Sequence, residues 1–202
     1  MKVALIGASG QGGSRLLAEL SRRGHHVTAI GRHPEKIARL PNVTASKGDV
    51  CDKAGLVALI KGHDAVISAV RFTASDPALL IEAVKAAGVR RYFVVGGAGS
   101  LEVAPGVKLV DTPQFPAAYK PEATKGGEFL DLLRKEKELE WTFLSPSAMV
   151  GPGERTGKFR LGKDQLLTTD KGSSISWEDY AIAAVNELEK PAHVRQRFTV
   201  GY

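Results

Sequence analysis

The sequence predicts an α/β fold, a doubly wound parallel sheet with helices on both faces. Two observations predict it. Strand-like and helix-like segments alternate strictly up to about residue 95, and the strand-like segments are apolar on both sides. Strands buried on both faces read as continuous apolar runs, and alternation with helices is typical of a parallel sheet. The chain has 202 residues, so we expect one domain over residues 1–202.

The chain opens with a glycine-rich turn between a strand and a helix. An apolar strand over residues 2–6 leads into the turn at residues 7–13, and a helix follows through Arg23. Glycines at positions 7, 10 and 13 let the backbone turn tightly, approach a pyrophosphate and pack the helix close to the strand. Amides at the helix N-terminus can hold phosphates. This stretch predicts a dinucleotide-binding Rossmann unit, whose second strand ends at Gly31-Arg32.

The alternation continues to residue 95. We expect a helix over 34–40, a strand over 43–46, a helix that stops at Gly62, a strand over 65–70, a helix over 77–87 and a strand over 92–95. Asp76 is a plausible N-cap, because aspartate accepts from free helix amides, and Pro77 suits the first helical position. The expected strand order is 3-2-1-4-5-6, with the cofactor across the carboxyl ends of strands one and four.

The strict alternation of strand-like and helix-like segments ends after residue 95. Two irregular segments, residues 96–120 and 145–176, are longer than ordinary connections, which in a compact domain indicates functional loops. We expect them to form a small C-terminal lobe on the substrate side, with a hairpin around residues 158–167. The regular elements in this half are a helix that opens at Pro121, strands over 141–144 and 197–200, and a helix over 177–188.

Composition argues against several functions. The formal net charge is +6 and the pI is near 9.5, but basic residues are scattered among acidic ones, so we expect no nucleic-acid partner. No apolar run approaches membrane-spanning length and no signal-peptide core is present, which indicates a cytoplasmic protein without membrane contact. Cys51 is the only cysteine, and no cluster has metal-ligand spacing, so we expect neither disulfide nor metal.

Arg32 indicates which dinucleotide is bound. NAD-selective units place an acidic side chain about twenty residues beyond the glycines, whereas arginine there suits the 2′-phosphate of NADP. We therefore expect NADPH to be preferred over NADH; the alternative is an exposed arginine at a strand end. The residues expected to bind the cofactor from their place in this unit are Gly7, Ser9, Gly10, Gln11, Gly12, Gly13, Arg32, Ser68, Ala69, Val70 and Gly96.

The G-x-x-G-x-x-G spacing resembles the short-chain dehydrogenase/reductase superfamily, particularly its extended and atypical members. With Arg32, Asp49, and residues 119–123, 145–147 and 153–159, it makes the whole chain similar to small bacterial atypical reductases described as NADH-flavin reductases. These are relatives of the biliverdin-IXβ/flavin reductases and the NADP-sensing nitrogen-regulation proteins. The resemblance implies that Asp49 and Val50 lie near the adenine and Pro146 near the nicotinamide.

The resemblance also points to Tyr119 and Ser100 as catalytic candidates. The best-known short-chain dehydrogenases use a tyrosine and a lysine four residues apart on one helix, but position 123 here is alanine. Lys125 lies six residues from Tyr119 and at helical pitch points elsewhere. Tyr119 is thus either an acid or a pocket-lining aromatic, and Ser100 either the serine of the catalytic set or a loop serine. The basic residues of 155–163 either bind a flat anionic substrate or form a solvated hairpin.

These observations favour an NADPH-dependent reductase that passes hydride to a flavin or similar planar or quinone acceptor. Two alternatives remain open: a binding protein that senses NADP(H) without turnover, and a carbonyl dehydrogenase or epimerase that uses Tyr119 or Ser100 as acid. In each case the partner is a small molecule, and the protein is a monomer or homodimer.

Overall fold

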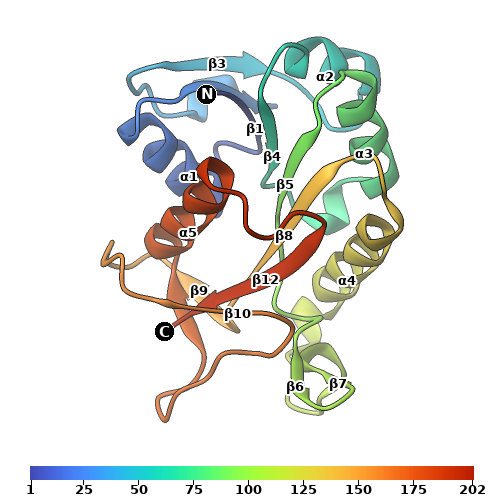
Figure 1. Ribbon diagram of the computed structural model, residues 1–202, viewed down its shortest axis with the longest axis vertical. Coiled ribbons are helices and arrows are strands. Elements are labelled where there is room, and N and C mark those ends of the chain that lie inside the picture. Colours follow the sequence, from blue (N-terminus) through green and yellow to red (C-terminus); the bar gives the residue numbers. More distant parts are fainter.

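The computed structural model describes residues 1–202 and contains an eight-stranded sheet (Figure 1). Its order is β10-β12-β8-β5-β4-β1-β2-β3, and every neighbouring pair is parallel except β10 with β12. The strands are β1 (Lys2–Ile6), β2 (His26–Gly31), β3 (Val43–Lys47), β4 (Ala65–Ser68), β5 (Arg91–Val95), β8 (Glu140–Pro146), β10 (Arg160–Gly162) and β12 (Gln196–Gly201). The expected order of the first six strands is confirmed.

Helices cover both faces of this sheet, as expected for a doubly wound fold. Figure 1 shows α1 (Gln11–Arg22) and α5 (Trp177–Glu189) on one side, and α2 (Lys53–Ile60), α3 (Pro77–Ala86) and α4 (Lys120–Lys135) on the other. Each layer has its own apolar core: Leu16 and Tyr180 belong to the first, Leu80 and Phe129 to the second. None of these helices combines the length and the apolar character that spanning a lipid bilayer requires.

Capping residues mark where several helices begin. The Asp76 carboxylate accepts from the amides of Ala78 and Leu79, and Pro77 is the first residue of α3. Ser176 caps α5 through the amide of Asp179 at 3.0 Å. The helix N-terminus has amides without intrahelical acceptors, so these side chains replace the missing partners. The Asp76-Pro77 start expected from the sequence is confirmed.

Two local expectations are wrong. Residues 34–40 form only a short 3-10 helix at Pro34–Lys36, because Ile37 adopts extended backbone and packs into the core at 5% exposure. Pro41 also disfavours helical backbone at the residue before it. Residues 158–167 form no hairpin. Instead β10 pairs with β12, whose second edge offers unpaired backbone groups.

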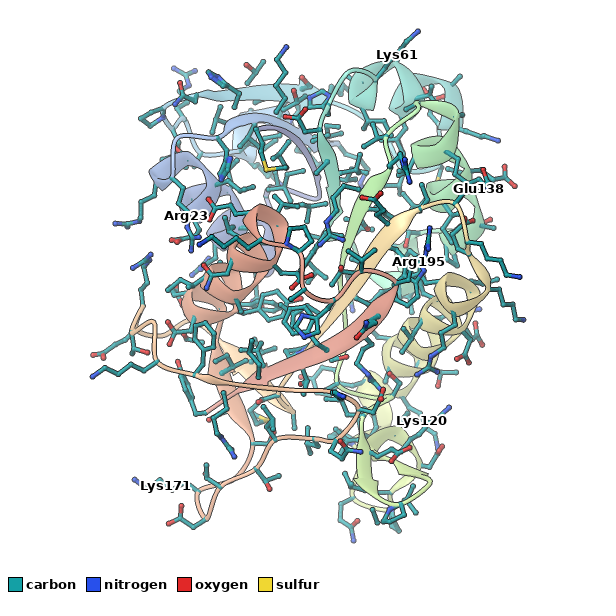
Figure 2. The ribbon with its side chains drawn as sticks, viewed as in Figure 1. Arg23, Lys61, Lys120, Glu138, Lys171 and Arg195 are labelled. Atoms are coloured by element: carbon teal, nitrogen blue, oxygen red, sulfur yellow. The ribbon has the colours of Figure 1, made fainter.

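The two irregular segments carry short strands of their own. Residues 96–120 contain the hairpin of β6 (Glu102–Ala104) and β7 (Val107–Lys108), and residues 145–176 contain the parallel pair β9 (Met149–Gly151) and β11 (Ser174–Ser176). Figure 2 shows Lys120, the first residue of α4, close to the β6–β7 hairpin, and Glu138 beyond the far end of that helix. The start of α4 therefore lies on the same side as these loops.

Candidate functional site

Two cavities lie at the carboxyl ends of the parallel strands. The first, of about 280 Å³, is lined at the ends of β1, β2 and β4; we call it the glycine-side cavity. The second, of about 420 Å³, is lined at the ends of β5 and β8 and by the start of α4; we call it the apolar cavity. Eight of the residues expected to bind a cofactor line the glycine-side cavity: Gly7, Ser9, Gly10, Arg32, Asp49, Val50, Ala69 and Val70.

The glycine turn is built by close backbone contacts. Gly7 has φ +84°, and its amide donates to the Ile30 carbonyl at 2.9 Å, which ties the turn to β2. A β-carbon on Gly7 would lie 2.5 Å from the Ala69 carbonyl oxygen, and one on Gly13 would collide with the Gly7 carbonyl. Side chains at these two positions are therefore excluded by the backbone itself.

The N-terminus of α1 offers free amides beside this turn. The helix begins after Gly10 without a side-chain cap and without an acidic residue in its first turn. The amides of Gln11, Gly12 and Gly13 have no backbone acceptor. Free amides and the positive end of the helix dipole favour an anion at this position. Gly12 also provides room for the Trp177 ring, which a β-carbon there would approach to 2.8 Å.

Two exposed arginines line the glycine-side cavity without an ion-pair partner. Arg32 follows β2, and Arg71 lies just beyond β4. Neither guanidinium forms a salt bridge within the chain, so both are available to an anionic ligand. Asp49 faces the same cavity and accepts from the Cys51 amide at 2.9 Å, a turn-forming contact. Sequence reasoning missed Arg71, although its position directly after strand four was a usable signal.

The apolar cavity contains one charged residue, Glu122, among the 19 that line it. Its aromatic walls are Phe72, Phe115, Tyr119 and Trp177. Gly96 and Pro146, both expected to contact the cofactor, line this cavity and not the glycine-side one. A β-carbon on Gly96 would collide with the Phe143 ring and lie 2.7 Å from the Leu144 carbonyl oxygen, so the backbone here packs too closely against β8 for a side chain.

One short segment separates the cavities. Ala69, Val70 and Arg71 line the glycine-side cavity, and Phe72 lines the apolar one. The Glu122 carboxylate holds this segment, accepting from the Phe72 amide at 2.7 Å, the Thr73 amide at 2.9 Å and the Thr73 hydroxyl at 2.6 Å. Nothing in the sequence pointed to this contact, because fifty residues separate its partners.

The two catalytic candidates differ in position. The Tyr119 side chain is 67% exposed and lines the apolar cavity. Ser100 does not line it, and its hydroxyl accepts from the Arg197 guanidinium at 3.3 Å. Lys125 pairs with Glu128 at 2.9 Å and does not line the cavity that Tyr119 lines. Ser68 is buried at the end of β4 and lines neither cavity.

The loop over residues 153–158 is fixed to α1 and α5. Arg155 forms a forked pair with Glu19 at 2.8 and 2.9 Å. The Asp179 carboxylate accepts from the Thr156 hydroxyl at 2.5 Å and from the amides of Thr156 and Gly157 at 2.8 Å. Burial raises the pKa of Asp179, but these hydrogen bonds outweigh it and hold that pKa below its ordinary value. Residues 153–158, which we call the strap, are therefore held in a fixed position against α1 and α5.

Comparisons with known proteins place the chain among relatives of the same length. It matches the family described as NAD(P)H-binding over residues 7–191. A "putative epimerase" from Bacteroides thetaiotaomicron is 47% identical, with a TM-score of 0.94 and coverage of 100% of this chain and 96% of that one. A "putative exported protein" from Burkholderia pseudomallei is 45% identical, with a TM-score of 0.90 and full coverage of both. A "putative NADH-flavin reductase" from Streptococcus pneumoniae is 37% identical, with a TM-score of 0.83 and coverage of 100% and 99%.

Proposed function

Because this chain belongs to the NAD(P)H-binding family, as an atypical short-chain dehydrogenase/reductase, we propose that it is a reductase that uses NADPH to reduce a flavin or similar planar acceptor. The observation that carries the proposal is the pair of cavities separated by residues 69–74. One has the features of a dinucleotide site, and the other is an apolar, aromatic-lined space for a second ring. The name of the Streptococcus pneumoniae relative is consistent with this division.

The residues of the glycine-side cavity fit a phosphorylated dinucleotide. The free amides of Gln11, Gly12 and Gly13 would hold the pyrophosphate, and the glycine turn keeps side chains out of its way. Arg32 would bind the 2′-phosphate in a forked geometry, which supports NADPH over NADH, and Arg71 adds a second free cation. Asp49 and Val50 are proposed to lie beside the adenine.

The chain's part in the reaction is to place and shield two rings. NADPH, when bound, would supply the chemistry of hydride transfer, which is two electrons and one proton for an oxidised acceptor. Gly96 and Pro146 line the apolar cavity at the ends of β5 and β8, and Phe72 lies in the segment between the two cavities. Water supplies the second proton that a two-electron reduction of a flavin or quinone needs. The reaction therefore requires no dedicated acid from the protein.

A second function is favoured by one specific residue. Tyr119 lines the apolar cavity, and a phenol there could protonate a carbonyl oxygen in a dehydrogenase or epimerase. The name of the Bacteroides thetaiotaomicron relative agrees with that class. Ser100 is a weaker candidate, because Arg197 engages its hydroxyl and it does not line the cavity.

Following the loss of reduced nicotinamide tests the proposal. NADPH is first shown to bind, and its oxidation is then followed with FMN, riboflavin, biliverdin and simple quinones. We expect oxidation with at least one planar acceptor. Tight binding without oxidation across the panel would refute the reductase and favour an NADP(H) sensor.

We further propose that residues 1–202 work as one domain, a monomer or homodimer in which residues 96–120 and 145–176 form the substrate side. We propose a cytoplasmic location, where the exposed thiol of Cys51 stays reduced. Since a relative bears the name of an exported protein, cell fractionation is the appropriate check.

A further inference from the structure

We propose that the apolar cavity takes an uncharged planar ring, such as riboflavin or a quinone, in preference to a phosphorylated flavin such as FMN. The inference rests on the proposed reductase function and specifies the acceptor of that same site. It follows from the charges that surround the cavity, from the partners of the nearby basic loop, and from the shape of the cavity walls.

The cavity offers no cation to a phosphate. No lysine, arginine or histidine lines it, and its one charged residue is the acid Glu122. That carboxylate already accepts three hydrogen bonds from Phe72 and Thr73, which hold it in place. A phosphate brought into this space would lose water without gaining a cationic partner and would face a like charge.

The basic residues of the loop over 155–163 do not line the cavity, and two of them are engaged by other partners. The Arg155 guanidinium is engaged by Glu19, and the Arg160 guanidinium donates to the carbonyls of Thr168 and Tyr202 at 2.8 and 2.6 Å. Lys158 and Lys163 do not line the cavity. The sequence hypothesis that this loop receives a flat anionic substrate therefore gains no support from its geometry.

The walls suit an uncharged ring system. Phe72, Phe115, Tyr119 and Trp177 present aromatic surface, and a volume of about 420 Å³ is within the range of ligand pockets. Tyr119 and Met149 line the cavity and are 67% and 71% exposed, so they also form an apolar rim. Contact area and stacking would supply the affinity, with no contribution from charge.

Equilibrium binding of oxidised flavins tests this inference without turnover. Riboflavin and FMN are titrated with protein and followed by quenching of flavin fluorescence at physiological salt, which screens the net charge of the protein. The titration is run with and without NADP, because Arg32 and Arg71 could capture the FMN phosphate in the other cavity. We expect riboflavin to bind about three- to tenfold more tightly than FMN when NADP is present.

A charge placed on the rim provides a matched pair of variants. Met149→Lys adds a cation at the rim of the cavity and should raise the affinity for FMN relative to that for riboflavin about threefold or more. Leu161→Lys adds the same charge at an exposed apolar position that does not line the cavity, and should leave this ratio unchanged. FMN binding as tight as riboflavin in the unmodified protein, or equal effects of both variants, would overturn the inference.

The binding assay and the NADPH oxidation assay test the acceptor preference and the reductase activity separately. Preference for riboflavin in the binding assay without any oxidation of NADPH would leave the inference standing and refute the reductase. Oxidation of NADPH that is as efficient with FMN as with riboflavin would do the reverse.

Discussion

The Glu122 carboxylate accepts the backbone amide of Phe72 at 2.7 Å, which joins the start of α4 to the wall between the two cavities. Hydrogen bonds to a charged group are worth about 1.5–3 kcal/mol each, and Glu122 also holds Thr73. We expect Glu122→Gln to lower the free energy of unfolding by about 1–3 kcal/mol and to raise KM for the acceptor. Denaturant unfolding and steady-state kinetics measure both.

The control for this change is Glu128→Gln on the same helix. Glu128 pairs only with Lys125, and both side chains are more than half exposed, so its loss should cost less than about 0.5 kcal/mol. Equal effects of the two variants on stability and KM would show that Glu122 does not position Phe72.

Tyr119 distinguishes the reductase from the dehydrogenase or epimerase. A general acid contributes about 10²- to 10⁴-fold to the rate, whereas a flavin or quinone can take its second proton from water. We expect Tyr119→Phe to keep kcat within about threefold, because the phenyl ring still lines the cavity. A loss of a hundredfold or more in kcat would assign Tyr119 as the acid and favour the second function.

Asp179 makes the position of the strap depend on pH. Its folded-state pKa lies below the ordinary value of 3.8, so its stabilising contribution is complete above that pH and is lost as pH falls through the folded pKa. We expect Asp179→Asn to cost about 2 kcal/mol at neutral pH, and the difference from the unmodified protein to shrink on acidification below pH 4.

Thermal unfolding at several pH values measures this dependence. The exposed Asp131, which pairs with Arg134 on α4, supplies the control variant Asp131→Asn, for which we expect almost no change. A difference between Asp179→Asn and the unmodified protein that stays constant from neutral to acidic pH would contradict the account of this carboxylate.

Arg32 is expected to select the nicotinamide cofactor. Arg32→Glu removes a free cation from the glycine-side cavity and adds an anion. The affinity for NADPH should therefore fall by about tenfold or more relative to the affinity for NADH. Lys137→Glu changes net charge equally at an exposed site outside both cavities, and should leave the ratio unchanged. Calorimetric titration with both nucleotides measures the ratio of NADPH affinity to NADH affinity. An unaltered ratio in Arg32→Glu would mean that this residue does not read the 2′-phosphate.

The sheet and the glycine turn could be predicted from the sequence because their signals are local. Continuous apolar runs identify strands buried on both faces, and Asp76-Pro77 marks a helix start without reference to the rest of the chain. The pairing of β10 with β12 could not be predicted in this way. It depends on an open strand edge about forty residues away, and a three-residue strand carries almost no periodicity.

The same distinction applies to the candidate site. The residues of the glycine-side cavity follow β1, β2 and β4 directly, so strand order alone brings Gly7, Arg32 and Ala69 together. The apolar cavity is assembled from segments far apart in the chain. Two of its contacts leave no pattern in the sequence, because each depends on how two helices pack. They are the packing of Trp177 against Gly12 and the hydrogen bond from the Phe72 amide to Glu122.

The most direct test of the central claim is the fate of a deuterium placed on one face of the nicotinamide C4. NADPH labelled on either face is oxidised anaerobically with riboflavin as acceptor, and the NADP product is analysed by mass spectrometry. If the two cavities hold the rings in a fixed arrangement, the label is lost from one face only. Loss from both faces equally, or no oxidation above the protein-free rate, would contradict the account.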